Sequence, residues 1–401
     1  MRRKVMMFRS AGSVLIVTAL AAAATGCVQP VEPGREAGAP SLRHTASSQF
    51  DVIDLGDFTP VAINSRREIA GQVTIGGSQH AVVWSGGALR DLGTLPPKDG
   101  ARPGYAAVVT GINRRGQIVG YESFDWPLED VRAFLWEDGV LREIGRGARG
   151  VYRVIASAIS DGGYVAGGSN PRGPLHATLW RDGSTRDLGT LGGLRSHALD
   201  VNDRGQVVGW SLINSGALHA FVWSNGAMRD LGTLGGSYST ASLINLRGQV
   251  VGQSTTATGE EHAFLWSNGV MRDIGAFRPV AISADGRVAL NSDRAAFVWG
   301  AGALTPVGSF SGGGYSRARD INNHAQVVGE AGAPSGEVHG FVWEGGALYD
   351  LGTPPGGTSS SAVAISDRGD IVGSVTTASG ESRAVLWRRI TPVGEMVAGR
   401  P

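Results

Sequence analysis

The chain has 401 residues, of which 42% are apolar and 18% are charged, so it carries ample material for a hydrophobic core. Its formal net charge is +1, and removing the four basic residues found within residues 1–26 leaves a net charge of −3. Without a basic surface stripe, this balance argues against a nucleic-acid partner. The single cysteine, Cys27, excludes an internal disulfide and a cysteine-based metal cluster.

The N-terminal segment, residues 1–26, has the form of an export signal. Residues 1–9 are basic, and the uncharged run over residues 10–24 is shorter than the roughly 20 apolar residues of a membrane-spanning helix. The segment resembles the bacterial lipoprotein signal, in which cleavage precedes a cysteine whose thiol is then lipidated, here Cys27. An ordinary cleaved secretion signal is the alternative. The resemblance implies a lipid anchor at the cell envelope, and residues 28–29 (Val-Gln) imply the outer membrane or the cell surface.

The segment after the signal, residues 27–49, starts with the cysteine and is rich in Pro, Gly, Ala and Ser without apolar periodicity. Such a composition predicts a flexible tether between the lipid and a folded domain. We assign that domain to residues 50–395 and a short tail to residues 396–401.

The region over residues 50–395 repeats one unit. Each copy predicts four strands: the first ends in Ile-Asn or Ile-Ser, the second is a Gln-Val-Val-Gly segment, the third ends at a tryptophan, and the fourth is Asp-Leu-Gly. Successive copies place this tryptophan at spacings of 52, 44, 43, 43, 33, 44 and 44 residues. The eight repeat tryptophans, which number the units one to eight below, are Trp84, Trp136, Trp180, Trp223, Trp266, Trp299, Trp343 and Trp387.

The turn between the third and fourth strands is the strongest local signal. Its central pair is Asn225-Gly226 in the clearest copy, and Asp-Gly, Gly-Gly or Ala-Gly pairs stand there in other units. Pairs of this kind accept positive φ at both positions, as a two-residue type I′ hairpin requires. Unit eight alone lacks such a pair.

The third strand is apolar on both faces, with a small residue three positions before the tryptophan and Val or Leu one position before it. A strand of this kind must be covered on both sides. In a β-propeller each sheet lies between two others and leaves no open edge. We therefore predict an all-β fold, a β-propeller of eight four-stranded blades, with seven as the alternative.

Two terminal segments can complete the last blade and close the ring. Residues 50–56 (FDVIDLG) copy a fourth strand before the first full unit, and we expect them to pair with the last blade. Residues 390–394 (ITPVG) fit the same place, so an N-terminal and a C-terminal closing strand both stay open.

One family pattern stands almost whole between His176 and Gly252. It reads His-Ala-Phe-x-Trp, then Asp-Leu-Gly-Thr-Leu-Gly-Gly, then Ile-Asn-x-x-Gly-Gln-Val-Val-Gly. The chain thereby resembles the HAF-repeat family of bacterial extracellular proteins over roughly residues 50–395. Unit six departs most, being short and carrying Leu290 in place of the second-strand glycine. The resemblance implies an exported repeat protein and no particular activity.

Five of the eight histidines occupy one repeat position, and an aspartate follows each of them eleven residues later. A hairpin centred on Asn225-Gly226 places His219 and Asp230 on one face, a diagonal step apart and within side-chain reach. Because five copies of an acid–base pair do not fit one active site, we predict structural hydrogen bonds rather than catalysis. The predicted pairs are His80–Asp91, His176–Asp187, His219–Asp230, His262–Asp273 and His339–Asp350.

Three units lack this histidine, and they lack the aspartate as well. A salt bridge is expected to replace the hydrogen bond in unit two. The residues at the two positions are Arg132 and Glu143, Ala295 and Pro306, and Arg383 and Pro392.

Two insertions, residues 96–109 and 121–131, interrupt the repeat and flank the same unit. In an up-and-down meander both belong to one face of the disc. The second insertion sets aromatic residues among acids, which suits a carbohydrate or protein partner, with an uneventful insertion as the alternative. A further tryptophan outside the repeat pattern points to the same face, with core packing as its other role. The candidate binding residues are Tyr121, Phe124, Asp125, Trp126, Glu129, Asp130 and Trp210.

The sequence therefore favours a lipid-anchored extracytoplasmic binding or scaffold module for a glycan or protein partner, and not an enzyme. No cofactor or metal site is predicted, and membrane contact is expected only through the lipid anchor. One alternative is a purely structural surface repeat protein. Another is a glycan lyase or hydrolase on the loop face, which would need ionisable groups that converge from several blades. The scattered candidates for that role are Glu122, Asp125, Arg195, His197 and His324.

Overall fold

The computed structural model describes residues 49–96, 106–123, 131–145, 153–170, 173–310 and 314–390. The regular elements of these ranges are β-strands, with no helix among them, so the all-β prediction is confirmed. Before unit one stands β1 (Phe50–Gly56). Units one to four comprise β2 (Thr59–Ile63), β3 (Ile69–Ile75), β4 (Ser78–Ser85), β5 (Ala88–Asp91), β6 (Ala106–Ile112), β7 (Ile118–Ser123), β8 (Val131–Glu137), β9 (Val140–Ile144), β10 (Val154–Ile159), β11 (Val165–Ser169), β12 (His176–Arg181), β13 (Ser184–Asp187), β14 (Gly192–Val201), β15 (Val207–Ile213), β16 (Leu218–Ser224) and β17 (Ala227–Gly232). Units five to eight comprise β18 (Gly235–Ile244), β19 (Val250–Thr256), β20 (Glu261–Ser267), β21 (Val270–Gly275), β22 (Arg278–Ile282), β23 (Val288–Asn291), β24 (Ala296–Gly300), β25 (Ala303–Pro306), β26 (Ser316–Ile321), β27 (Val327–Gly332), β28 (Val338–Glu344), β29 (Ala347–Asp350), β30 (Gly357–Ile365), β31 (Ile371–Thr377) and β32 (Ser382–Arg389).

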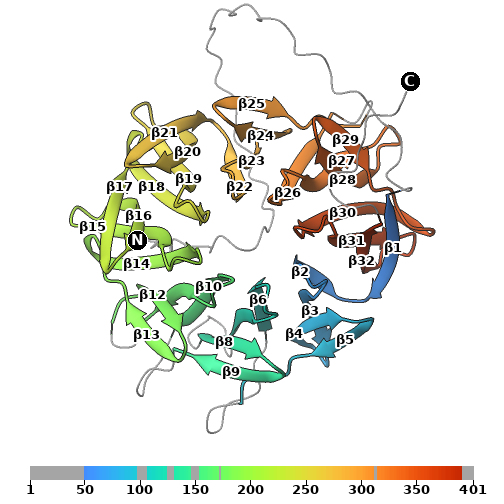
Figure 1. Cartoon of the computed structure of the whole chain (residues 1–401), viewed down its shortest axis with the longest axis horizontal. Helices are drawn as coiled ribbons and strands as arrows, with labels where there is room; N and C mark the ends of the chain where they lie inside the picture. The colour runs from blue at the N-terminus through green and yellow to red at the C-terminus, as the bar shows by residue number, and fades with distance from the viewer. Residues whose placement is uncertain are drawn as a thin grey trace, which may run out of the picture.

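The strands of each unit pair as an antiparallel meander, and the sheets surround a common centre (Figure 1). The first strands of the units, such as β2, β10 and β22, lie nearest the centre, and the fourth strands, such as β5 and β13, lie at the rim. Four sheets have four strands, and two have eight because a single parallel contact joins two successive units. This arrangement is a β-propeller.

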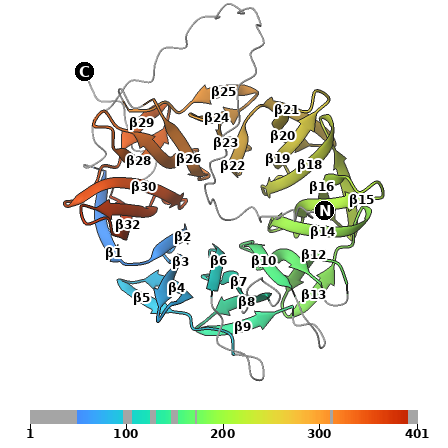
Figure 2. The ribbon, with the colours of Figure 1, turned by 180° about the vertical axis from the view of Figure 1, so that it is seen from behind.

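The last sheet combines the two ends of the folded region. Strand β1 pairs antiparallel with β32, with Val52 opposite Trp387, and takes the place of a fourth strand (Figures 1 and 2). Of the competing segment, residues 390–394, the described ranges include only Ile390, whose backbone N–H donates to the carbonyl oxygen of Gln49 at 3.0 Å. The N-terminal strand therefore occupies the position that the sequence had left open between two candidates.

The hydrophobic core is divided among the junctions between units. Eight clusters of buried residues each combine two successive units, and one of them joins unit eight to unit one. Each repeat tryptophan packs against the preceding unit; Trp223, for example, lies with Ala166 and Leu179 of unit three. Ala220 and Phe221 are completely buried, so the third strand is covered on both faces as predicted.

The hairpin turns have the predicted backbone conformation. Asn225 has a φ of 52° and Gly226 a φ of 89°. Both central residues have positive φ in units one to seven, which is the requirement that restricts this position to Gly, Asn or Asp in most units.

Glycine is needed in the second strand for a steric reason that the sequence did not reveal. Strand one bulges between Ala198 and Asp200, and this brings a carbonyl oxygen close to the facing glycine. A Cβ atom at Gly209 would lie 2.0 Å from the carbonyl oxygen of His197. Any larger residue at this position needs a local shift of the backbone.

A belt of hydrogen bonds runs along the inner turns and connects successive units. Asn202 Oδ1 accepts the backbone N–H groups of Arg204 and Gln206. Its Nδ2 donates to the carbonyl oxygen of Asn245 in the next unit at 3.0 Å. The same inter-unit bond is made from Asn64, Asn113, Asn245 and Asn322.

Units three, six and eight have serine at this position, and a side chain of the following unit supplies the connection instead. The acceptors are Asp203 Oδ1 for the N–H of Gly162, at 2.7 Å, and Asn323 Oδ1 for the N–H of Ala284, at 2.8 Å. From unit one, Arg67 Nε donates to Asp370 of unit eight at 2.8 Å. Every pair of successive units, including units eight and one, is thus joined near the axis.

Candidate binding site

The predicted binding loop is described only at its edge. Tyr121 lies in β7 and Trp210 in β15, and both are half-buried. The other predicted binding residues and the lipidation site fall outside the described ranges; they are Phe124, Asp125, Trp126, Glu129, Asp130 and Cys27.

Trp210 lies against a buried histidine. The ring centroids of Trp210 and His197 are 6.1 Å apart, and His197 Nε2 lies 3.1 Å from the hydroxyl of Ser157 in unit three. The His197 ring fills the space over Gly168, where a Cβ atom would lie 2.3 Å from Nδ1. Burial lowers the pKa of His197 to about 4, so the ring is neutral at physiological pH. This pair fills the space between units three and four.

Glu122 lies in β7 and contacts Leu95. It is 1% exposed, and its two carboxylate oxygens accept the backbone N–H of Leu95 at 3.0 and 3.1 Å. Burial raises the pKa of Glu122 to about 7, although that hydrogen bond and the nearby Arg132 oppose the shift. Among the described residues, no contact joins Glu122 to His197 or to His324, which lies in an inner turn and lines a cavity between units six and seven. Of the candidates for an enzyme site, Glu122, His197 and His324 are thus not in contact with one another.

Two further aspartates, which the sequence analysis did not single out, bridge successive units. Asp200 Oδ1 accepts the N–H of Val201, and Oδ2 accepts the N–H of Ile244 in the next unit, both at 2.8 Å. Asp320 makes the same two bonds, to Ile321 and to Ile365 of unit eight. Burial raises the pKa of Asp200 to about 7 and that of Asp320 to about 6.

Each predicted His–Asp pair is brought into hydrogen-bond distance. Phe221 lies opposite Asp230, the predicted register, and His219 Nδ1 is 2.8 Å from Asp230 Oδ2. The other four pairs have distances of 2.9 Å. Asp230 Oδ1 also accepts the N–H of Gly232 at 2.7 Å, so one carboxylate fixes both the hairpin and the bend that follows it.

The His–Asp pairs are partly exposed to solvent. The side chains of His219 and Asp230 are 17% and 40% exposed. Because water competes for both partners, the bond stabilises the fold less than a buried hydrogen bond does.

The units without this histidine use other partners. In unit two, Arg132 Nη1 lies 3.5 Å from Glu143 Oε2, the expected ion pair. In unit eight the sequence comparison of Arg383 with Pro392 was misleading. Arg383 instead forms an ion pair at 2.7 Å with Asp54 of β1, so the N-terminal strand supplies the acid that the repeat lacks.

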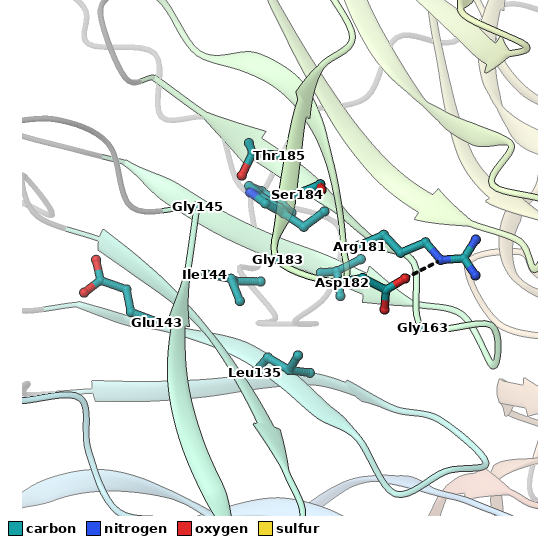
Figure 3. Close-up of a pocket in the computed structure, with 12 residues that line it drawn as sticks. Leu135, Glu143, Ile144, Gly145, Gly163, Arg181, Asp182, Gly183, Ser184 and Thr185 are labelled. Carbon is teal, nitrogen blue, oxygen red and sulfur yellow. Dashed lines mark hydrogen bonds and ion pairs between the residues drawn. The ribbon is translucent and has the colours of Figure 1, made fainter.

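Clefts open between some successive units, at the face that carries the inner and hairpin turns. The cleft between units two and three has a volume of about 280 Å³, and its walls are the hairpin of β12 and β13 and the rim strand β9 (Figure 3). Clefts of about 470 and 490 Å³ lie between units five and six and between units six and seven. Each cleft is lined by the repeat tryptophan of the following unit, which is Trp180, Trp299 or Trp343.

At three other junctions an arginine covers this tryptophan. Its guanidinium lies over the ring of the next unit, 4.7 to 5.5 Å from the centroid. The arginine immediately precedes the aspartate of Asp-Leu-Gly, a signal that was visible in the sequence but was not interpreted. The stacked pairs are Arg90–Trp136, Arg186–Trp223 and Arg229–Trp266.

The clefts lie where this stack is missing. The equivalent residue between units six and seven is Thr305, which lines the cleft there. Between units two and three it is Arg142, and between units five and six it is Arg272; within the described ranges neither stacks on a tryptophan. At the three junctions with a cleft, no Arg–Trp stack is therefore found among the described residues.

Comparison with solved structures shows the fold. The chain is similar to dipeptidyl peptidase 4 of Porphyromonas gingivalis, at 9% identity and a TM-score of 0.52, over 88% of this chain and 62% of that one. It is also similar to the β-propeller domain of the trilobed protease from Pyrococcus furiosus, at 8% identity and a TM-score of 0.49, over 85% of this chain and 99% of that domain. A puromycin-hydrolyzing peptidase of Mycobacterium tuberculosis matches at 14% identity and a TM-score of 0.48, over 80% of this chain and 57% of that one. The chain thus spans less than two thirds of each of the two matched peptidase chains.

At the level of sequence, no family model matches the chain, and no curated protein matches it. Over the part of the chain that the structure describes, no helix is long and apolar enough to cross a membrane. The same ranges contain no group of three or more His, Cys, Asp or Glu side chains arranged to hold a metal ion.

Proposed function

We propose that this chain is an exported propeller that acts as a binding or scaffold module for a glycan or protein partner. The observation that supports this most is the repeated cleft between successive units. Each cleft combines a tryptophan with polar side chains and opens on the same face, and such a mixture is typical of sites that recognise ligands. Because the clefts differ in lining, one scaffold offers several distinct surfaces.

We further propose that the propeller has eight blades and that β1 closes the ring. The support for eight blades is the set of eight inter-unit clusters together with the hydrogen-bonded belt, which connects unit eight to unit one through Arg67 and Asp370. The support for closure by β1 is its pairing with β32 and the Arg383–Asp54 ion pair. Membership in the HAF-repeat family belongs to the same proposal.

Anchoring at the envelope rests on the signal-like segment and Cys27. We expect the native protein to be labelled by radioactive palmitate and to fractionate with membranes. A Cys27→Ser variant should lose the label, and a label that persists in this variant would contradict the anchor.

The binding function is tested with the full-length protein in detergent on glycan and protein-partner arrays. The control is Thr305→Arg, which places an arginine where three other junctions carry one and should close the cleft between units six and seven. Loss of a partner in this variant would assign that partner to this cleft. If the wild type retains no glycan or protein on either array, the binding function is wrong.

One observation favours an enzyme as a second candidate. A buried carboxyl group with a pKa near 7, as at Glu122, is common where general acid–base chemistry takes place. If Glu122 has this role, Glu122→Gln should abolish turnover of a glycan substrate while the protein stays folded. Equal turnover by the two proteins would exclude it.

A further inference from the structure

We propose that the inner turns form a ring of arginines that binds an anionic glycan, a polysaccharide whose sugars carry carboxylate or sulfate groups. This inference rests on the proposed binding function and names the charge of the ligand and the surface that recognises it. The inner turns are the eight five-residue segments that join the first and second strands of each unit, and each begins with the Asn or Ser of the hydrogen-bonded belt.

The inner turns gather a positive charge that the chain as a whole does not have. They contain eight arginines and six carboxylates, a net charge of +2, whereas residues 27–401 together carry −3. The remainder of that region therefore carries −5, so charge is separated within the molecule. The arginines are Arg66, Arg67, Arg114, Arg115, Arg204, Arg247, Arg287 and Arg368, and the carboxylates are Glu68, Asp161, Asp203, Asp285, Asp367 and Asp370.

Five of these arginines occupy one repeated position, the second residue after the Asn or Ser of the belt. All five are exposed, and units three, six and seven have Gly162, Asp285 and His324 at the same position. We call the five the ring arginines, and they are Arg66, Arg115, Arg204, Arg247 and Arg368.

The side chains of three ring arginines extend from one unit to the next. Arg66 Nη2 donates to the carbonyl oxygen of Arg115 at 2.8 Å, and Arg247 Nη1 donates to that of Asp285 at 3.3 Å. Arg115 lies across Gly163, where a Cβ atom would collide with its Nη2. The positive charge is thus distributed around the axis instead of being confined to one unit.

The other charges of the inner turns are largely compensated. Arg114 forms ion pairs with Asp161 at 3.0 Å and with Asp367 at 2.9 Å. The remaining ion pairs are Arg66–Glu68, Arg67–Asp370 and Arg287–Asp285.

Four ring arginines have no carboxylate within ion-pair distance among the described residues; they are Arg115, Arg204, Arg247 and Arg368. One inner-turn carboxylate has no arginine partner in the same ranges. This is Asp203, which accepts the backbone N–H of Gly162 at 2.7 Å. The uncompensated groups of the inner turns are therefore four cations and one anion, which favours an anionic ligand.

The ring surrounds a polar pocket on the axis. The inner turns of units two to seven all contribute to this pocket, which has a volume of about 240 Å³. Leu246, which is 44% exposed, is the one exposed large apolar residue of the inner turns. The centre of a protein interface is apolar and poor in charge, so this surface suits a charged polymer better than an acidic protein.

The chemistry of arginine fits such a polymer. Its planar fork donates two parallel hydrogen bonds to the oxygens of one anionic group. A glycan with an anionic group on successive sugars can engage several ring arginines at once, and each contact after the first is then intramolecular. Single-stranded nucleic acid would need aromatic side chains for its bases. The one aromatic residue of the inner turns, Tyr164, is covered by Arg181, whose guanidinium lies 4.1 Å from the centroid of its ring.

The test uses the full-length protein in nonionic detergent and a fluorescent decamer of galacturonic acid, whose binding is followed by anisotropy. The matched control is the methyl-esterified decamer, which has the same sugars without the charge. We expect saturable binding of the acid that weakens as sodium chloride is added, and at least about tenfold weaker binding of the ester. A sulfated dextran fragment compared with dextran shows whether sulfate replaces carboxylate. Binding of either anionic glycan supports the proposal, and the stronger of the two identifies the anionic group.

Three variants locate the interaction. Arg204→Gln combined with Arg368→Gln removes two ring arginines that form no ion pair, and should weaken binding at least about fivefold at an unchanged melting temperature. Arg278→Gln combined with Arg294→Gln is the control, because it removes the same charge from exposed arginines beside the connections of the opposite face. It should bind as the wild type does. His324→Arg adds a ring arginine in unit seven and should tighten binding.

Three results would overturn the proposal: equal binding of the acid and the ester, undiminished binding by the ring variant, or an equal loss in the control variant. Tighter binding of an oligonucleotide or of polyglutamate than of both anionic glycans would also refute it, because the ring would then serve another class of ligand. If the arrays yield a partner and neither anionic glycan binds, the binding function stands and this inference fails. Failure of both the arrays and the anionic glycans would refute both.

Discussion

The junction between units three and four and the junction between units two and three have similar apolar cores. They differ in whether an arginine lies over the tryptophan, and we call this covering arginine the seal. In the first, Arg186 lies over Trp223 and the junction is filled. In the second, Trp180 is packed among alanine and valine side chains in the same way, but an adjacent cleft stays open. The apolar packing between units is therefore separable from the cation that covers it. A repeat can therefore lack the covering arginine, and have a cleft beside its tryptophan, without changing its fold.

The largest effect on stability is expected from removing the tryptophan of the apolar core that both junctions have. Trp223→Ala should lower the free energy of unfolding by about 3–5 kcal/mol, because it deletes a large buried side chain and leaves a cavity. Trp180→Ala should cost about 0.5–1 kcal/mol less, since no Arg–Trp stack is lost with it. Urea denaturation of the two variants measures the difference. A larger loss at Trp180 would contradict the idea that the two junctions differ only in the seal.

The belt of inner-turn hydrogen bonds is present at both kinds of junction. Removing one of its bonds should therefore lower the free energy of unfolding by a similar amount at either junction. Asn202→Ala removes the bond to Asn245 and uncovers the turn amides of Arg204 and Gln206. We expect a loss of about 1–3 kcal/mol, the usual effect of leaving buried polar groups unpaired. Asn113→Ala, at the open junction, should cost a similar amount in the same denaturation experiment. If only one of these two variants lost stability, the contribution of the belt would depend on whether an arginine covers the tryptophan at that junction.

The bridging aspartates make the junctions sensitive to pH. Because the pKa values of Asp200 and Asp320 are raised in the folded protein, to about 7 and about 6, the folded chain holds protons that the unfolded chain has already released above pH 4. Stability should therefore fall as the pH rises from about 4 to about 7. Glu122 acts in the same direction. Unfolding at pH 5 and pH 8 measures the slope, which should be shallower in Asp320→Asn; a wild-type stability that increases over this interval would refute the assignment.

A covering arginine can also be introduced at a junction that lacks one. Thr305→Arg should place a guanidinium over Trp343 and raise the free energy of unfolding by about 0.5 kcal/mol. The neighbouring Arg287, which lines the same cleft, limits the gain by repulsion. Thr305→Met is the matched control, because it adds a long side chain without the charge. Equal stabilisation by both variants would show that filled volume, and not the cation, seals the junction.

The smallest effect is expected inside a single unit. His219→Ala removes the partly exposed partner of Asp230, and we expect a loss of roughly 0.5 kcal/mol, as for other solvent-accessible ion pairs. A loss above about 2 kcal/mol would show that the five His–Asp bonds contribute more than their exposure indicates.

Features contained within one unit were predictable from the sequence. The I′ hairpin, the register of Phe221 with Asp230 and the double-sided burial of the third strand all depend on residues fewer than a dozen positions apart. The role of residues 50–56 as a rim strand was also predictable, because the segment repeats the Asp-Leu-Gly pattern.

Contacts between units were not predictable in the same way. The stack of Arg186 on Trp223, the bond of Asn202 to Asn245 and the bridge of Asp200 to Ile244 join residues of adjacent units. A repeat pattern shows that these residues recur, but not which neighbour each one meets. The pairing of Arg383 with Asp54 spans 329 positions and depends on the first strand joining the last sheet.

The meeting of Gln49 with Ile390 has a consequence for biosynthesis. The first strand to be made finds its partner only in the last, so its sheet stays incomplete until almost the whole chain has been synthesised. Completion of the last sheet is therefore a late step of folding, because β1 must wait for β32.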